Sequence, residues 1–169
     1  MSAFCPFNVL GLAPSFNLSA DELRRAWMRR VATAHPDAGG DVADAARLND
    51  AYQALLDPLL RSAALLQARH APPSDERALP AGFLLEMMEL RERLDAACGD
   101  ESVLRELKEE GARLKDSAIA DIARAFNEGD NGSVLTPDAT HHVWLGMNVL
   151  RAAQRMLEQL DRGAGESAR

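Results

Sequence analysis

Apolar positions recur along most of this chain at steps of three and four residues, which is the period of an α-helix. Alanine, leucine, arginine and glutamate dominate the composition, and these residues favour helix over strand. Glycine, proline and the few aromatic residues give no strong strand pattern. The sequence therefore predicts an all-α fold with helices over 6–10, 20–34, 42–57, 59–69, 80–98, 100–128 and from 137 to about 162. Asp57 and Asp100 are the expected N-caps of the helices that follow them.

The helix expected over 20–34 has the clearest start and end signals. Ser19 followed by Glu22 matches a capping box, so the helix should begin at Ala20. Pro36 lacks a backbone N–H and disfavours helical geometry at His35, so the helix should end there. One buried stripe is expected on this helix, formed by Leu23, Trp27, Val31 and Ala34.

The other side of the same helix is cationic and leads directly to a His-Pro-Asp tripeptide. His35 and Asp37 should be held on an exposed loop, because Pro36 stops the helix between them. An arginine face alone is usually only a solvated face. Here Arg25 and Arg29 lie opposite the apolar stripe, with Arg24 and Arg30 on its flanks.

A second helix should return alongside the first. Gly39 and Gly40 allow the chain to reverse, and Asp41 can cap a helix over 42–57. The loop does not fit a calcium site, because the positions that would need oxygen ligands or glycine hold other residues. Two helices joined in this way form an antiparallel hairpin. Its inner face should include Leu48, Ala51, Tyr52 and Leu55.

The clearest break in the chain is Ala71-Pro72-Pro73-Ser74-Asp75, where two adjacent prolines stop a helix and stiffen a connection. The prediction is an N-terminal domain over 1–72, a linker over 73–80, a C-terminal domain over 81–162 and a tail over 163–169. The three long helices of the C-terminal domain are amphipathic and joined by short connections, which favours a three-helix bundle.

The helix over 80–98 is more apolar than a three-helix bundle requires. Phe83, Met87, Leu90, Leu94 and Ala97 complete one buried stripe. The surplus side chains either pack against the N-terminal domain or form an exposed apolar patch with an acidic rim, which marks a protein-binding site. These surplus residues are Leu84, Leu85 and Met88, beside Glu89, Glu92 and Asp95.

The charge and hydropathy of the sequence argue against several classes of function. The net charge of −7 argues against a general nucleic-acid binder, and residues 71–169 carry all of it. No apolar run is long enough to cross a bilayer, and the N-terminus lacks the pattern of a signal or transit peptide. Cys5 and Cys98 lack metal-ligand spacing and suit a reducing compartment, so the protein is expected in the cytoplasm.

The first half of the chain resembles a J domain, the part of DnaJ-type co-chaperones that contacts DnaK-type chaperone ATPases. The resemblance is carried by the short opening helix, the arginine-faced helix with His35-Pro36-Asp37, and the run from Asn49 to Leu55. It implies that the tripeptide and Arg24, Arg25, Arg29 and Arg30 bind the chaperone. Ala38 stands where J domains usually carry a basic residue.

The whole chain resembles the HscB or Jac-type family, co-chaperones of iron–sulfur cluster assembly with a J domain and a C-terminal three-helix bundle. The later match is the run from Phe83 to Asp95. The resemblance implies binding to a DnaK/HscA-type chaperone and delivery of an IscU-type iron–sulfur scaffold protein to it. The implied scaffold contacts are Leu84, Leu85, Met88, Glu89 and Glu92.

The sequence leaves two other hypotheses about function. The C-terminal domain could bind a different client or self-associate. A hydrolase or metalloenzyme would have to use His35, His141 and His142, but no nucleophile has a positioned base and no metal-ligand spacing emerges. Adjacent helical histidines point about 100° apart and do not easily share a metal. The expectation is a protein that is not an enzyme and needs no cofactor, metal, nucleic acid or membrane.

Overall fold

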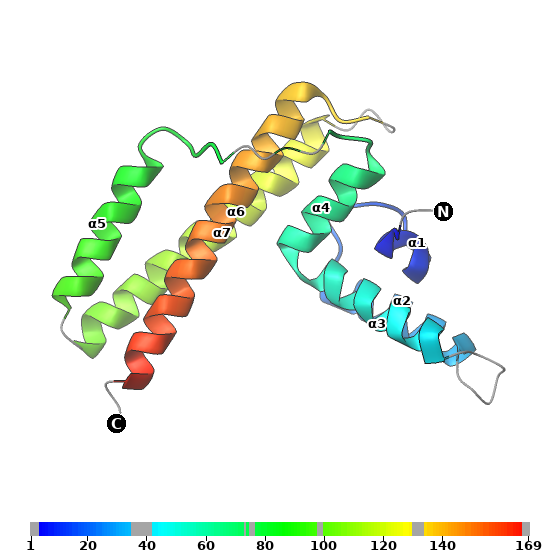
Figure 1. The fold of residues 1–169 in the computed structure, drawn as a ribbon, viewed down its shortest axis with the longest axis horizontal. Helices are drawn as coiled ribbons and strands as arrows, with labels where there is room; N and C mark the ends of the chain where they lie inside the picture. Colours follow the sequence, from blue (N-terminus) through cyan, green and yellow to red (C-terminus); the bar gives the residue numbers. More distant parts are fainter. Residues whose placement is uncertain are drawn as a thin grey trace. The chain divides into compact units, whose positions relative to one another are not determined.

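The computed structural model describes residues 4–34, 42–72, 74, 77–97, 100–129 and 134–166, and within these ranges the fold is all-α (Figure 1). The chain divides into two compact units. The first contains Met1–Pro72 with Gly129–Thr136, and the second contains Pro73–Glu128 with Pro137–Arg169. The helices of the described residues are α1 (Pro6–Leu10), α2 (Ala20–Ala34), α3 (Val42–Leu56), α4 (Pro58–Ala68), α5 (Phe83–Ala96), α6 (Glu101–Gly129) and α7 (Pro137–Glu166).

The first unit is arranged around α3, which contacts α1, α2 and α4. Gly11 closes α1 in the left-handed conformation, with φ of 66°. Asp57 caps α4 by accepting hydrogen bonds from the backbone N–H groups of Leu59 and Leu60, at 2.7 and 2.9 Å. Because these N–H groups have no partner within the helix, the cap fixes where α4 begins after α3. The predicted cap at Asp57 is confirmed.

An aromatic pair holds α2 against α3. The rings of Trp27 and Tyr52 stack with their centroids 5.4 Å apart, and Trp27 Nε1 donates a hydrogen bond of 2.9 Å to Asn49 Oδ1. Leu23, Ala26, Leu48, Ala51 and Leu55 are buried. These contacts form an antiparallel hairpin, as predicted.

Arg61 on α4 ties the connection between α1 and α2 to the rest of the first unit. Its guanidinium donates to the carbonyl oxygens of Phe16 and Leu55, at 2.8 and 2.7 Å, and lies over the Phe16 ring. Burial lowers the pKa of Arg61, and Asp57 opposes that shift. The guanidinium remains a cation, because arginine is not deprotonated in folded proteins.

The second unit contains the three long helices α5, α6 and α7, which pack as a bundle (Figure 1). A buried cluster joins Leu90 of α5, Leu107 of α6, and Met156 and Leu160 of α7. Asp100 caps α6 by accepting a hydrogen bond of 2.9 Å from the Ser102 N–H. The predicted bundle and the predicted cap at Asp100 are confirmed.

Two helix ends differ from prediction. Helix α5 begins at Phe83 and not near residue 80, because Gly82 adopts a left-handed conformation with φ of 83° that a right-handed helix does not contain. Helix α7 continues to Glu166, although the sequence predicted a tail from Gly163. A glycine costs a helix only about 1 kcal/mol, which neighbouring helix formers can offset.

The buried stripe of α2 also differs in detail. Leu23 is fully buried as expected, but Trp27 and Val31 are only partly buried, and Ala26 is fully buried instead. The side chain of Ala34 lies outside the described residues. The small Ala26 side chain allows a close approach between helices, which places the larger Trp27 at the edge of the interface.

Substitutions of two leucines in the second unit should have different effects on stability, because one side chain is buried and the other is exposed. Leu107→Ala removes a fully buried side chain and should lower the free energy of unfolding by about 2–5 kcal/mol. Leu84→Ala removes a side chain that is 65% exposed and should change it by less than about 0.5 kcal/mol. Urea unfolding followed by circular dichroism measures both. A large loss of stability in Leu84→Ala would mean that the exposed face of α5 is needed for folding.

Candidate functional site

The first candidate site is the cationic side of α2. Arg24, Arg25, Arg29 and Arg30 are all exposed. Among the described residues, no carboxylate forms an ion pair with any of them. Their charges are therefore available to an acidic partner surface, while the opposite side of the helix packs on α3.

The capping box fixes the start of this arginine-bearing helix. Ser19 donates to Glu22 Oε2 from its backbone N–H and its hydroxyl, at 2.8 and 2.7 Å, and Ser19 Oγ accepts from the Glu22 N–H at 3.2 Å. The predicted capping box is confirmed. The hydroxyl hydrogen bond is the main cause that lowers the pKa of Glu22, followed by the backbone N–H, and the positive charge of Arg25 lowers it further.

At the other end of this surface, the Arg30 guanidinium lies against Gly11. A Cβ atom on Gly11 would lie 2.6 Å from Arg30 Nη2, so a larger residue there would make this flexible side chain shift. The constraint that favours glycine at this position is the left-handed turn after α1. The remaining residues of this candidate site, His35, Pro36 and Asp37, lie outside the described residues, together with Ala38.

The second candidate site is the side of α5 that faces away from its core stripe. Phe83 and Leu90 are buried, whereas Leu84, Leu85 and Met88 are 65%, 62% and 54% exposed. The three surplus side chains are therefore not part of the core of the second unit. The structure thus leaves a patch of large apolar side chains on the surface, which is typical of a protein-binding site.

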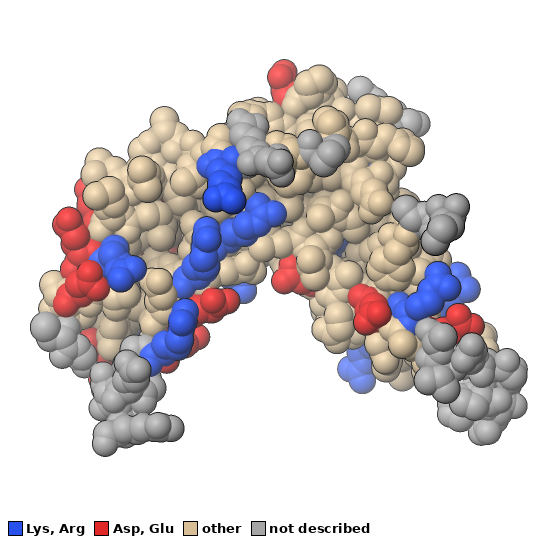
Figure 2. Space-filling view, in the orientation of Figure 1, with Lys and Arg blue, Asp and Glu red and all other residues tan. Residues whose placement is uncertain are grey.

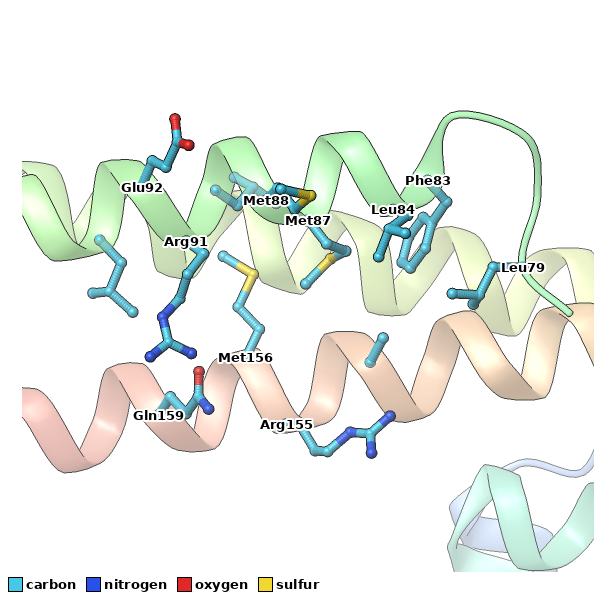
Figure 3. A pocket seen from close by; sticks show the side chains of 13 residues that line it. Leu79, Phe83, Leu84, Met87, Met88, Arg91, Glu92, Arg155, Met156 and Gln159 are labelled. Carbon is cyan, nitrogen blue, oxygen red and sulfur yellow. The ribbon is translucent and has the colours of Figure 1, made fainter. Parts of the chain in front are cut away.

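This patch borders a groove of about 480 Å³ between α5 and α7 (Figure 3). Leu84, Met87 and Met88 line it from α5, and Met156 reaches towards α5 from α7. Methionine side chains are flexible and adapt to different contact shapes, which suits a groove that receives a partner. The groove and the exposed patch together give α5 a continuous apolar surface.

The acidic and basic side chains around this apolar surface differ in whether they form ion pairs. Glu89 and Glu92 are exposed, and Glu92 points away from α7 (Figure 3). Arg91 forms an ion pair of 3.5 Å with Asp95. Arg93 forms one of 2.8 Å with Glu110 on α6. The two glutamates therefore keep an acidic edge on the outer side of α5.

The contribution of α7 to the groove was missed in the sequence. Ala152, Arg155 and Met156 line it, opposite the α5 residues. In the sequence, steps of three and four predict a core face of α7 formed by Val143, Met147, Leu150, Leu157 and Leu160. Met156 lies one residue before Leu157 and is the more deeply buried of the two. A methionine next to the core stripe was the available signal.

The known proteins most informative about this architecture are co-chaperones. Residues 79–136 match the family model of the HscB C-terminal oligomerisation domain. A co-chaperone HscB homolog of Bordetella petrii is 36% identical over 139 residues, covering 76% of this chain and 77% of that protein. The homolog of Ralstonia nicotianae is 30% identical over 168 residues, covering 92% of this chain and 95% of that protein. The chain belongs to the HscB co-chaperone family.

Solved structures of HscB proteins have the same fold as this family member. The crystal structure of the human co-chaperone HscB aligns with a TM-score of 0.74 at 21% identity, covering 94% of this chain and 81% of that one. HscB from Vibrio cholerae aligns with a TM-score of 0.74 at 24% identity, covering 95% and 98%. Helices α1 to α4 thus correspond to the J domain, and helices α5 to α7 correspond to the C-terminal helical domain.

In the described part of this HscB-family chain, no cluster of three or more His, Cys, Asp or Glu side chains is placed to hold a metal ion. The rings of His141 and His142 lie 6.0 Å apart on α7. None of the described helices combines the length and apolarity needed to span a lipid bilayer.

The capping box predicts a measurable titration. Ser19→Ala removes the hydroxyl donor but keeps the backbone N–H, so the pKa of Glu22 should rise towards its ordinary value without reaching it. Because the folded-state pKa is lowered, the stabilisation exists above the ordinary pKa and is lost as the pH falls through the folded value. The variant should therefore lose less stability on acidification. An NMR titration of the Glu22 carboxyl carbon in both proteins measures the shift, and an unchanged pKa would contradict the assigned cause.

Proposed function

We propose that this protein is a co-chaperone that stimulates the ATPase of a DnaK/HscA-type chaperone and delivers an IscU-type iron–sulfur scaffold protein to it. In this role it assists the assembly and transfer of iron–sulfur clusters. The observation that carries the proposal is the exposed apolar side of α5 on a chain of the HscB co-chaperone family. Membership of that family supports the chaperone as the partner.

The J domain contributes the contact with the chaperone. Arg24, Arg25, Arg29 and Arg30 would dock on an acidic surface of the ATPase, where complementary charge steers and orients the encounter. His35, Pro36 and Asp37 would then bias the conformational equilibrium of the ATPase towards hydrolysis. Coupling of this kind is typically worth about 1–3 kcal/mol. Such coupling corresponds to a change in rate of about fivefold to 150-fold.

The C-terminal domain contributes the contact with the client. Leu84, Leu85 and Met88 would form the apolar centre of that contact, and Glu89 and Glu92 would form a charged edge. Complete burial of one such apolar side chain is worth about 1.5–3 kcal/mol. Three such side chains would supply at most about 4.5–9 kcal/mol. The loss of freedom on association costs about 4–15 kcal/mol, so contacts around these side chains must add to the affinity.

On this account the protein does not catalyse a reaction. Chemistry would take place in the chaperone, which hydrolyses ATP, and on the scaffold, which carries the cluster as cargo. The two functional surfaces of this chain would act by bringing those proteins together and by shifting a conformational equilibrium. No cofactor is required for either step.

Self-association of the C-terminal domain is the second candidate. It is favoured by the description of the matching family model as an oligomerisation domain, together with the exposed groove between α5 and α7. A J-domain protein with a different client would use the same surface. These alternatives make different predictions for the substitution that follows.

Truncating the exposed apolar centre should weaken scaffold binding. Leu84→Ala combined with Met88→Ala should cost about 2 kcal/mol or more, or at least roughly thirtyfold in Kd, because centrally placed apolar anchors dominate such interfaces. Isothermal titration calorimetry of the full chain against the scaffold measures the affinity. Leu60→Ala combined with Val134→Ala is the matched control, since these side chains are 54% and 56% exposed and lie outside α5.

Measurements on the same protein samples distinguish the client-binding role from self-association. If wild type binds the scaffold and only the α5 variant loses affinity, the client role stands. If wild type does not bind the scaffold, the client assignment is wrong. Sedimentation velocity then decides whether the α5 variant dissociates an oligomer that wild type forms, which would favour self-association.

A further inference from the structure

Three arginines gather beside the apolar groove. Arg77, Arg151 and Arg155 line a hollow of about 800 Å³, whose lining residues all belong to the second unit. Leu79, Ala152 and Arg155 line both this hollow and the groove between α5 and α7. The two are therefore one continuous surface, apolar along α5 and cationic along α7.

Hydrogen bonds from one side chain hold this arrangement together. Asn148 Nδ2 on α7 donates to the Ala78 carbonyl oxygen at 3.0 Å, which fixes the segment before α5 against α7. Asn148 Oδ1 accepts from Arg151 Nη1 at 2.8 Å, which orients that guanidinium. Arg77 precedes the anchored residue, and Arg155 lies one helical turn beyond Arg151. The sequence thus builds the cluster through Asn148.

The arginine cluster has no acidic partner among the described residues. No carboxylate in those ranges forms an ion pair with Arg77, Arg151 or Arg155. Guanidinium groups only donate hydrogen bonds, and they match the two oxygens of a carboxylate. Like charges placed together repel, so an anion at this position would relieve the repulsion as well as bind.

Across the groove, α5 carries acidic side chains along its outer edge, while its Arg91 lines the groove and pairs with Asp95. Figure 2 shows Lys and Arg side chains in a row over α7, and Asp and Glu side chains along the outer edge of α5. Glu89 and Glu92 are among the exposed residues of α5, whereas the cluster contributes Arg151 and Arg155 from α7. The apolar surface therefore lies between an acidic edge and a basic edge.

We infer that Arg77, Arg151 and Arg155 form a carboxylate-binding site. This site binds acidic side chains of the client segment while the apolar part of that segment lies in the groove. The inference rests on the proposed client-binding role of α5 and adds its specificity. The client segment has apolar residues followed by acidic ones, and it lies with the acidic end on α7. The two charged edges of the surface allow only one direction of docking.

Two capped peptides test the site without the scaffold. One is a short peptide with leucines followed by glutamates, and the other has glutamine in place of each glutamate. Titration into the full chain, followed by NMR of the methionine methyl groups, should show Met87 and Met156 shifting with both peptides. The glutamate peptide should bind about threefold to fivefold more tightly, which is the upper part of the range for exposed ion pairs.

Matched variants assign that preference to the cluster. In Arg151→Gln combined with Arg155→Gln, both peptides should bind equally. In Arg105→Gln combined with Arg113→Gln, the preference should remain, because these exposed arginines of α6 change the net charge equally but line neither hollow nor groove. Equal binding of both peptides to wild type would overturn the inference. A preference that is as large in the α7 variant as in wild type would also overturn it.

The scaffold protein separates this inference from the proposed function. With scaffold as the probe, the α7 variant should bind about threefold to fivefold more weakly than the α6 control variant, and the difference should shrink at high salt. If the glutamate peptide is preferred but the scaffold does not bind wild type, the carboxylate site stands and the proposed client is wrong. If the scaffold binds both variants equally, the inference about the client segment is wrong while the proposed function stands.

Discussion

A helix in a three-helix bundle buries only one of its faces, and α5 is apolar on two. Phe83 and Leu90 satisfy the packing requirement of the bundle, so Leu84, Leu85 and Met88 are left on the surface. Exposed leucine and methionine lower solubility and add nothing to the core, which makes a functional reason for them the simplest explanation. The proposed client-binding role of α5 depends on this surplus.

The two compact units divide the proposed work between different physical interactions. In the J domain, a charged face on α2 would provide long-range attraction to a chaperone, while the Trp27–Tyr52 stack and the buried residues of α3 hold that helix in place. In the C-terminal domain, apolar contact with the proposed client would provide the affinity, and charges on either side would provide direction. A protein that only connects two partners needs no buried reactive group, and the two surfaces suffice for that role.

Helical periodicity and capping rules were enough to predict the all-α fold, the capping box at Ser19 and the caps at Asp57 and Asp100, because these depend on neighbours in sequence. The surplus residues of α5 could be named but not placed, because exposure depends on packing between distant helices. The same limit explains the missed groove residues Ala152, Arg155 and Met156, which lie across from α5 on α7. The start of α5 after Gly82 depends on the left-handed backbone angle of that glycine, which could not be predicted from the sequence.

The most direct test of the account is steady-state ATP hydrolysis by a DnaK-type chaperone with the scaffold present. Wild type is compared with His35→Gln, with Leu84→Ala/Met88→Ala, and with an equimolar mixture of the two variants. The account predicts that wild type stimulates hydrolysis, that scaffold adds to the effect, and that the mixture does not recover this addition, because one chain must hold both partners. Full recovery by the mixture, or no stimulation by wild type, would contradict it.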